Sequence, residues 1–427
     1  MLNPFFFAFV AWWGSPALGE LGVPLAWYDA KIFDWPTQSD AVVHEIIQDY
    51  LTRLTRLGYD RRQQGIWLQT EWAYLAQNQA QIAAPAASLT KVATTLAVVD
   101  RWGLDHRFET RVYGVGPVEN GVLLGDLIIE GGYDPLLVWE EAIALGNALH
   151  QGGIREVKGN LIIVGPLSFN FASEPQTVGS LLQQAFNSSQ WSATVEKQYQ
   201  TLPAGTGRPR IVFRGEVRSQ AVLPPGAQLW VRHQSATLAQ LVKQMNIYSN
   251  NEMAEILSQS VGGAAEVTAA VSRLANVPAG EIQLENGSGL GVDNRLSPRA
   301  VTLIYQALEQ KIKPQGLTLG DLFPVMGRDR EGTLEWRNLP QGVAVKTGTL
   351  NRVSALAGII PTRERGTVWF TIINGGPNFD RLRAEQDKML QRLADHWQVL
   401  PSELEPGPQD TVLLGEPNRN QLLLNPS

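Results

Sequence analysis

The stretch AAPAASLTKVATTLAVV, residues 83–99, places a serine and a lysine three positions apart where a helix is expected to begin. Its apolar residues recur at helical spacing, and Gly103 is expected to end the helix. Residues i and i+3 share one face of a helix, so the amine of Lys91 can approach the hydroxyl of Ser88 and, once neutral, accept its proton. The alternative is a capping serine beside a solvent-facing lysine, because S-x-x-K is expected by chance about 0.4 times in such a chain.

The overall composition narrows the classes of function. The 427 residues are 44% hydrophobic and 18% charged, which is typical of a globular protein of two or three domains. A formal net charge of −6 gives no general attraction to nucleic acid or to anionic membranes. The chain has no cysteine, and its five histidines lack the paired spacing of a metal site. We therefore expect no metal, no cofactor and no nucleic-acid partner, and no sequence pattern predicts an oligomeric state.

The amino terminus carries an apolar segment followed by the small-residue pattern Ala17-x-Gly19. This resembles a signal peptide, so residues 1–19 are expected to be removed from an exported protein. The first basic residue is Lys31, which makes the segment atypical and leaves an apolar strand or helix as the alternative. No apolar run reaches the length of about 18 residues that a membrane-spanning helix needs, so no stable membrane span is expected.

The remaining chain shows a change of pattern in its middle. Apolar spacing predicts a helix at 41–57, and QGIWLQTEWAYLAQN (64–78) predicts a pair of strands. Short β-rich runs separated by Gly, Pro and Asn then continue to about residue 234, interrupted by one helix. Helical patterns follow, and residues 342–375 predict three consecutive antiparallel strands closed by a helix at 379–397.

These changes of pattern predict the domain boundaries. We expect one discontinuous domain of residues 20–105 and 235–400, which is interrupted by a strand-rich insertion domain of residues 106–234. Residues 401–427 have little periodicity and are expected to form a loosely held C-terminal tail.

A second candidate element is VAVKTGTL (343–350), in which Lys346-Thr347-Gly348 and then Thr349 close an apolar run. A strand that ends in this way places a cation and hydroxyls at the edge of a cleft, and glycine leaves room for a substrate backbone. K-T-G is expected by chance only about 0.04 times, which makes it a stronger signal than S-x-x-K. The alternative is an edge strand protected by a lysine.

The third element, S-x-N, occurs twice, at 168–170 and at 249–251. The first copy follows a strand inside the β-rich region. The second copy lies in YSNNEMAEIL, a polar turn between two predicted helices, where side chains can project into a cleft. We therefore favour the second copy as part of a site.

The ordered set Ser88-x-x-Lys91, Ser249-x-Asn251, Lys346-Thr347-Gly348 resembles the penicillin-recognising serine enzymes, the penicillin-binding proteins and serine β-lactamases. Within them the chain is similar to the low-molecular-mass D-alanyl-D-alanine carboxypeptidases of the penicillin-binding protein 4 type, peptidase family S13. Four further stretches are similar to family segments and occur in family order: GDLIIEGGYDPLL, YSNNEMAEIL, ENGSGLGVDNRLSP and FPVMGRDREGTL. The resemblance covers roughly residues 40–395.

The resemblance implies an α+β fold, with a β-lactamase/transpeptidase-like domain interrupted by the strand-rich insertion. In this domain an antiparallel sheet is flanked by helices and accompanied by a helical subdomain. The implied function is a periplasmic, penicillin-sensitive D-Ala-D-Ala carboxypeptidase that acts on peptidoglycan stem peptides and is acylated by β-lactam inhibitors. Cleavage of D-Ala–diaminopimelate cross-links is a further possibility of the family. This chain departs from the family at Asn250 and Asn286, where Asp is common, and at Gly291, where Ser is common.

The same resemblance implies the roles of the motif residues in catalysis. Ser88 would attack the carbonyl of the penultimate D-alanine, with Lys91 as the base. Ser249 would pass a proton to the departing amine, and Asn251 would hold the substrate amide and orient the lysine.

The resemblance also implies that the K-T-G element binds the substrate. Lys346, Thr347 and Thr349 would bind the terminal carboxylate, with Gly348 between them. Backbone N–H groups of Ser88 and Thr349 would form the oxyanion hole.

Three alternatives stay open at this stage. A serine β-lactamase shares the motifs, but the glutamate that deacylation requires would be Glu285, and the asparagine expected four positions later is Gly289. A non-catalytic wall-binding protein could keep the fold, although all the motif residues are intact. An α/β-hydrolase would need G-x-S-x-G, which NGSGLG does not supply, so Ser288 is expected in a tight turn.

Overall fold

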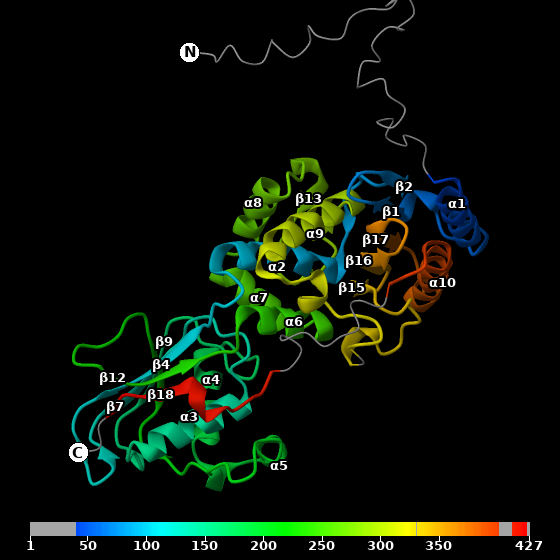
Figure 1. The fold of residues 1–427 in the computed structure, drawn as a ribbon. Coiled ribbons are helices and arrows are strands. Elements are labelled where there is room, and N and C mark those ends of the chain that lie inside the picture. Colours follow the sequence, from blue (N-terminus) through cyan, green and yellow to red (C-terminus); the bar gives the residue numbers. More distant parts are fainter. Residues whose placement is uncertain (1–39, 330, 401–411, 425–427) are drawn as a thin grey trace, which may run out of the picture.

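The computed structural model describes residues 40–329, 331–400 and 412–424. The predicted signal peptide and residues 401–411 of the predicted tail lie outside these ranges. Over the described residues, no helix combines the length and the apolar character that a membrane crossing requires. Figure 1 shows two lobes, one with a sheet between helices and one rich in strands.

The first lobe is built on an antiparallel sheet in the order β15-β16-β17-β1-β2. The strands are β1 (Gln64–Gln69), β2 (Tyr74–Asn78), β15 (Ala344–Leu350), β16 (Val353–Thr362) and β17 (Gly366–Gly375). Helices α1 (Ala41–Arg56) and α10 (Phe379–Trp397) cover one face. Neighbouring residues of a strand point to opposite faces: Leu356 packs towards these two helices, and Ala357 packs towards the helices of the other face. The predicted strands and both predicted helices are therefore confirmed.

The other face of the sheet carries a helical subdomain, which shares one core with it. Its helices are α2 (Thr90–Trp102), α6 (Leu238–Tyr248), α7 (Asn251–Ser260), α8 (Ala264–Leu274) and α9 (Pro298–Ile312). Helix α2 is central, and every residue from Thr90 to Val99 is buried. A small sheet of β3 (Ala84–Pro85), β13 (Ile282–Gln283) and β14 (Arg295–Leu296) ties the start of α2 to the segment before α9.

The second lobe has its own core and two sheets. The larger sheet has the order β11-β9-β7-β4-β12-β18, with parallel pairs β11–β9 and β9–β7 and antiparallel pairs elsewhere. Its strands are β4 (Glu109–Val115), β7 (Asp126–Glu130), β9 (Leu161–Val164), β11 (Val217–Gln220), β12 (Gln228–Gln234) and β18 (Asn420–Leu422). The smaller sheet contains β5 (Val118–Glu119), β6 (Val122–Leu123), β8 (Glu156–Val157) and β10 (Val212–Phe213). The helices of this lobe are α3 (Trp139–Gln151), α4 (Pro175–Ala185) and α5 (Ala193–Tyr199).

The chain passes between the lobes at two connections, from α2 to β4 and from β12 to α6. The expected boundaries of the insertion domain stay a prediction; residue 106 lies between α2 and β4, and residue 234 is the last residue of β12.

The C-terminal segment differs from the expected loose tail, because residues 412–424 return to the second lobe (Figure 1). Strand β18 pairs antiparallel with β12 and completes the edge of the larger sheet. Beside it, Arg419 is only 9% exposed and forms an ion pair of 2.7 Å with buried Glu141 of α3. The prediction was wrong here because a three-residue edge strand has no detectable periodicity, and its partner lies 189 positions earlier, as in the pair Arg232↔Gln421.

Candidate active site

Ser88 lies in a tight turn that leads directly into α2. A short 3-10 helix, Ala87–Leu89, precedes the α-helix, and Ser88 keeps part of its side chain exposed. The preceding residue, Ala87, has φ of 50°, a left-handed conformation that is costly for a residue with a side chain. Gly289, with φ of +81°, lies close against this turn, since an added Cβ would collide with the carbonyl oxygen of Ala87. Such local strain is typical of positions that present a functional group.

Lys91 is completely buried one helical turn after Ser88. Its Nζ donates hydrogen bonds to Ser88 Oγ (3.1 Å), to Asn251 Oδ1 (2.7 Å) and to the carbonyl oxygen of Ser288 (2.8 Å). An ammonium group has three N–H donors, and these contacts use all of them.

Burial lowers the pKa of Lys91 to about 7, and the nearby carboxylates of Glu255 and Glu252 act in the opposite direction. The neutral amine is therefore well populated near neutral pH. A neutral amine within hydrogen-bond distance of a serine hydroxyl can act as its general base.

The second S-x-N element forms the turn between α6 and α7. Ser249 ends α6 in a left-handed conformation with φ of 54°, and Asn251 is the first residue of α7. The middle residue, Asn250, caps α7 by accepting a hydrogen bond from the backbone N–H of Met253 at 2.9 Å. Asn and Asp are equally good caps, so the departure from the family at position 250 keeps the turn intact.

The first S-x-N copy stays outside this cluster. It lies in the second lobe, where Phe169 is fully buried in that lobe's core. The turn that contacts Lys91 is therefore the one expected from its place between two helices.

Lys346 joins the K-T-G strand to the S-x-N turn. It is completely buried, and its Nζ donates hydrogen bonds to Ser249 Oγ and to the carbonyl oxygen of Thr347, both at 2.9 Å. Burial, with the positive charge of Lys91 nearby, lowers the pKa of Lys346 well below its usual value. Two of the N–H donors of Lys346 are therefore used by hydrogen bonds within the protein.

The other K-T-G residues lie within strand β15, near its end, and its pairing with β16 extends to Leu350↔Val353. A Cβ at Gly348 would approach the carbonyl oxygen of Ala86 (3.0 Å) and the Cβ of Ala87 (3.2 Å). The glycine therefore lets the strand lie close to the turn that carries Ser88.

The two threonines of the motif differ in exposure. Thr347 is 6% exposed, whereas Thr349 is partly exposed and its Oγ1 accepts a hydrogen bond from Arg383 Nη2 at 2.7 Å.

The structure adds Glu255, which the sequence analysis missed. Its two carboxylate oxygens accept hydrogen bonds from the backbone N–H groups of Gly287 and Ser288, each at 3.0 Å. These contacts fix the loop whose Ser288 carbonyl binds Lys91. A signal was present in the sequence, because Glu255 follows Asn251 by four positions and so shares its face of α7.

No group of three or more His, Asp or Glu suited to a metal ion occurs among the residues that the structure describes.

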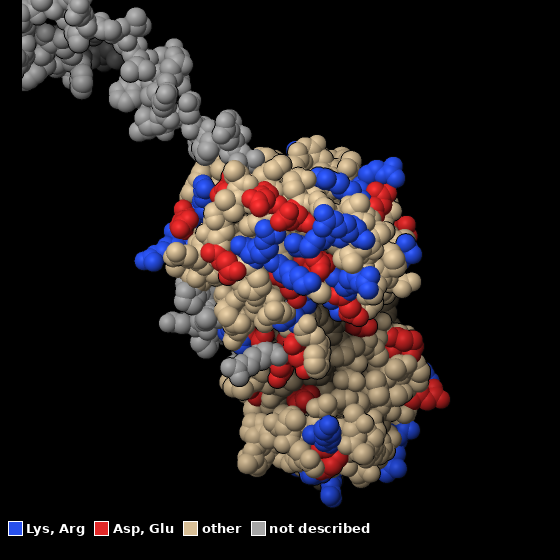
Figure 2. All heavy atoms as spheres, turned by 90° about the vertical axis from the view of Figure 1, so that its right-hand side faces the viewer, with Lys and Arg blue, Asp and Glu red and all other residues tan. Residues whose placement is uncertain are grey.

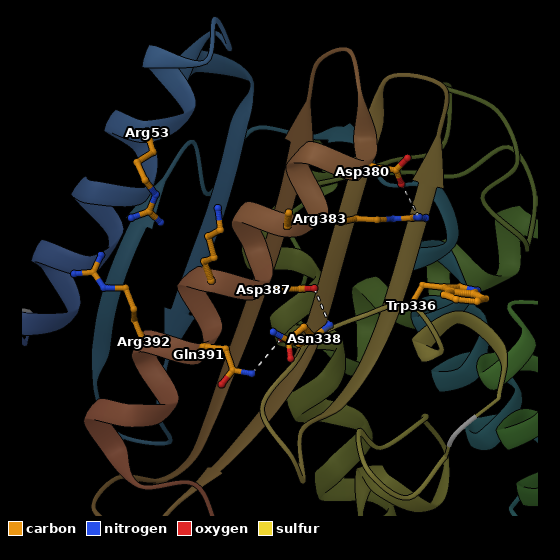
Figure 3. Close-up of a pocket in the computed structure, with 10 residues that line it drawn as sticks. Arg53, Trp336, Asn338, Asp380, Arg383, Asp387, Gln391 and Arg392 are labelled. Atoms are coloured by element: carbon orange, nitrogen blue, oxygen red, sulfur yellow. Dashed lines mark hydrogen bonds and ion pairs between the residues drawn. The ribbon is translucent and has the colours of Figure 1, made fainter.

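A cavity of about 720 Å³ lies along α10 and is lined by Arg53, Trp336, Arg383 and Arg392, among others (Figure 3). Figure 2 shows Lys and Arg gathered on this side of the first lobe, with acidic residues between them. Most of these cations are paired, for example Arg53 with Glu385 at 2.9 Å. Only Arg383 also contacts the K-T-G strand.

Comparison with known proteins agrees with this arrangement. Residues 63–199 and 178–396 match the model of the D-Ala-D-Ala carboxypeptidase 3 (S13) family. A carboxypeptidase of Mycobacterium tuberculosis is 33% identical over 178 residues, which is 37% of this chain and 38% of that protein. A D-alanyl-D-alanine carboxypeptidase of an Actinomadura species is 32% identical over 188 residues, 40% of this chain and 34% of that protein. The chain thus spans little more than a third of the length of these relatives.

The fold has solved counterparts as well. A predatory peptidoglycan endopeptidase from Bdellovibrio bacteriovorus superimposes with a TM-score of 0.65 at 22% identity, over 80% of this chain and 93% of that one. This similarity confirms the predicted fold class, an antiparallel sheet flanked by helices with a helical subdomain and a strand-rich insertion.

Proposed function

Because the chain belongs to the D-Ala-D-Ala carboxypeptidase 3 (S13) family, we propose that it is a serine peptidase that cleaves the D-Ala–D-Ala bond of peptidoglycan stem peptides. One observation carries this proposal: the buried amine of Lys91, with a pKa of about 7, lies 3.1 Å from the hydroxyl of Ser88. The lysine of a simple capping motif would face solvent, whereas this one is buried and placed to take a proton from the serine.

In the first step Ser88 Oγ attacks the carbonyl carbon of the penultimate D-alanine while neutral Lys91 takes the hydroxyl proton. A C–O bond forms, and the carbonyl oxygen gains the negative charge. Backbone N–H groups of Ser88 and Thr349 would stabilise this oxyanion. The C–N bond then breaks, and the departing amine of the terminal D-alanine takes a proton.

Ser249 is the proposed donor of that proton. Its Oγ accepts a hydrogen bond from Lys346 at 2.9 Å, which leaves its own O–H free to point at the leaving nitrogen. Asn251, whose Oδ1 binds Lys91 at 2.7 Å, keeps its NH₂ group for the substrate amide. Water then attacks the acyl carbon, and the C–O bond to Ser88 breaks. Ser88 Oγ regains the proton that Lys91 took, a proton of the water restores the hydroxyl of Ser249, and the shortened peptide leaves.

We also propose that β-lactams acylate Ser88, since the Bdellovibrio endopeptidase has been captured acylated by penicillin G. Rapid turnover of the drug, as in a β-lactamase, is not expected. Glu285 is exposed, and both oxygens of Glu255 are bound to backbone N–H groups, so neither carboxylate is placed to activate a deacylating water. The amino-terminal pattern at residues 1–19 supports export, and peptidoglycan as substrate supports a periplasmic location.

The direct test is release of D-alanine from a stem pentapeptide. The wild-type protein is expected to release D-alanine, and Ser88→Ala is expected to release none above background. Ser219→Ala, at an exposed serine of β11 in the second lobe, is the matched control and should keep the activity. Fast hydrolysis of penicillin without release of D-alanine would support the β-lactamase alternative instead.

A further inference from the structure

A buried ion pair joins helix α6 to the segment that precedes strand β15. Lys243 of α6 is completely buried, and its Nζ lies 2.7 Å from Asp329 Oδ2. The same ammonium donates hydrogen bonds to the carbonyl oxygens of Gly320 and Phe323, both at 2.8 Å. We propose that Lys243 and Asp329 are a positioning pair, which holds Ser249 where it can give its proton to the leaving amine, an inference that rests on the proposed function.

The pair anchors a stretch of sequence that the proposed mechanism leaves without a role. Asp329 belongs to FPVMGRDREGTL (323–334), one of the stretches similar to family segments. Its side chain is only 9% exposed, and its Oδ2 also accepts a hydrogen bond from the backbone N–H of Val325 at 2.7 Å. A buried charge is stable only when it is paired and hydrogen-bonded, so these contacts favour one arrangement of the segment and α6.

On one side, this segment is attached to the helix that ends at Ser249. Lys243 provides one attachment, and Asn246 provides a second, because its Nδ2 donates a hydrogen bond to the carbonyl oxygen of Leu322 at 3.0 Å. Ser249 is the C-cap of α6 and follows Lys243 by six positions, which is about 9 Å along a helix. A displacement of α6 at Lys243 should therefore also displace Ser249.

On the other side, the segment is attached to the strand that carries Lys346. The backbone N–H of Val345, the residue before Lys346, donates to the carbonyl oxygen of Pro324 at 2.9 Å. The segment thus connects α6 to β15 at the place where Lys346 Nζ donates to Ser249 Oγ at 2.9 Å. Because this contact orients the Ser249 hydroxyl, the pair acts on the reaction through Ser249.

The proposed task of Ser249 depends on the leaving group. When an amide is cleaved, the C–N bond breaks and the nitrogen takes the proton of the Ser249 hydroxyl. When a thioester is cleaved, the C–S bond breaks and the sulfur keeps the electron pair as a thiolate, which needs no proton. In both cases Ser88 attacks the carbonyl carbon and Lys91 takes the proton of Ser88. A displaced Ser249 should therefore slow the cleavage of an amide and spare that of a thioester.

A matched amide and thioester test this expectation. Both have the same acyl-D-alanyl group; the leaving group is D-alanine in one and its sulfur analogue, D-thiolactate, in the other. The quantity to compare is kcat/KM, because it covers the steps up to acylation and leaves out hydrolysis of the acyl-enzyme that both substrates share. Ser249→Ala should lose activity on the amide and keep it on the thioester.

Lys243→Met is the variant that tests the pair. It cuts the link to α6 without isolating Asp329, because Arg328 Nε also lies 3.8 Å from Asp329 Oδ2. Its kcat/KM should fall roughly 10- to 100-fold for the amide, the effect of displacing a catalytic group, and stay within about 3-fold for the thioester. The matched control is Asp100→Asn, which breaks a pair with Lys311 near the end of α2 and should leave both values unchanged.

A second variant keeps the test decisive if Lys243→Met does not fold. Asp329→Asn removes the charge but keeps an oxygen that can accept from Lys243, so it should show a smaller loss that is again confined to the amide. Activity on the thioester itself shows that each variant is folded.

The outcomes separate this proposal from the proposed function. Equal losses on both substrates in Lys243→Met or Asp329→Asn would show a purely structural role, and unchanged values would show that the pair does not hold Ser249. Equal losses in Ser249→Ala would show that Ser249 is not the proton donor. Each of these results overturns the proposal while the peptidase function stands. A wild-type protein that cleaves neither substrate would refute the proposed function itself, and the role of the pair with it.

Discussion

The rate at which Ser88 is acylated should depend on pH through Lys91. The pKa of Lys91 falls from 10.5 to about 7 on burial. This lowering of the pKa corresponds to about 5 kcal/mol in favour of the neutral amine. At pH 7 about half of the Lys91 side chains are neutral, compared with about 0.03% for an ordinary lysine, so burial enlarges the population of active base by about a thousandfold.

The assay is rapid mixing with a fluorescent penicillin between pH 5 and pH 9. Below pH 7 the acylation rate should fall about tenfold per pH unit, since the neutral fraction does so, and above pH 7 it should level off. Lys91→Arg is the matched variant, because a guanidinium stays charged over the whole range. Its acylation rate should be lower than that of the wild type by roughly 10²- to 10⁴-fold, the usual contribution of a general base.

Two results would refute the reasoning about Lys91. One is a wild-type rate that stays constant between pH 5 and pH 8. The other is a Lys91→Arg protein that is folded by circular dichroism and acylates within about tenfold of the wild type, which is less than the usual loss of a base.

Three further variants probe the supports of the site and of the fold. Glu255→Gln removes a negative charge that raises the pKa of Lys91, so the acid limb of the acylation profile should move to lower pH. Gly289→Ala places a side chain at φ of +81° against the turn of the nucleophile, and penicillin labelling should fall by about 100-fold or more. Arg419→Gln breaks the ion pair with Glu141, so the free energy of unfolding in urea should fall by about 2–3 kcal/mol with labelling at 25 °C unchanged.

A different result would contradict each of these three expectations. An acid limb that stays in place in Glu255→Gln would show that this carboxylate has no influence on the base. Normal labelling of Gly289→Ala would show that the turn tolerates displacement. If Arg419→Gln unfolds at the wild-type urea concentration, the C-terminal segment adds nothing to the stability of the second lobe.

The central pair of residues could be predicted from sequence because the interaction is local. Ser88 and Lys91 are three positions apart on a helix, and helical geometry alone brings them together. The contact of Lys346 with Ser249 joins residues 97 positions apart, and only the resemblance to a known family indicated it. The sequence analysis missed Glu255, whose two hydrogen bonds reach residues 32 and 33 positions away, and a single residue of that kind forms no motif.

Two features of the sequence have packing contacts in the structure that the sequence analysis did not predict. Gly348 was expected to make room for substrate, which stays a prediction, and in the structure it also leaves room for the turn at Ala86 and Ala87. The sequence around Gly348 does not indicate this contact, because the turn belongs to a segment far away in the sequence. In the same way, the segment before Leu424 lacks periodicity, and the edge of a sheet formed much earlier in the chain orders it.

The most direct measurement is the intact mass of the protein after incubation with penicillin, followed by peptide mapping. The wild-type protein is expected to gain the mass of one penicillin molecule, and the modified peptide should carry it on Ser88. Ser88→Ala should gain no mass. An adduct of equal yield in Ser88→Ala, or one that maps to another residue of the wild-type protein, would contradict the assignment of Ser88 as the nucleophile.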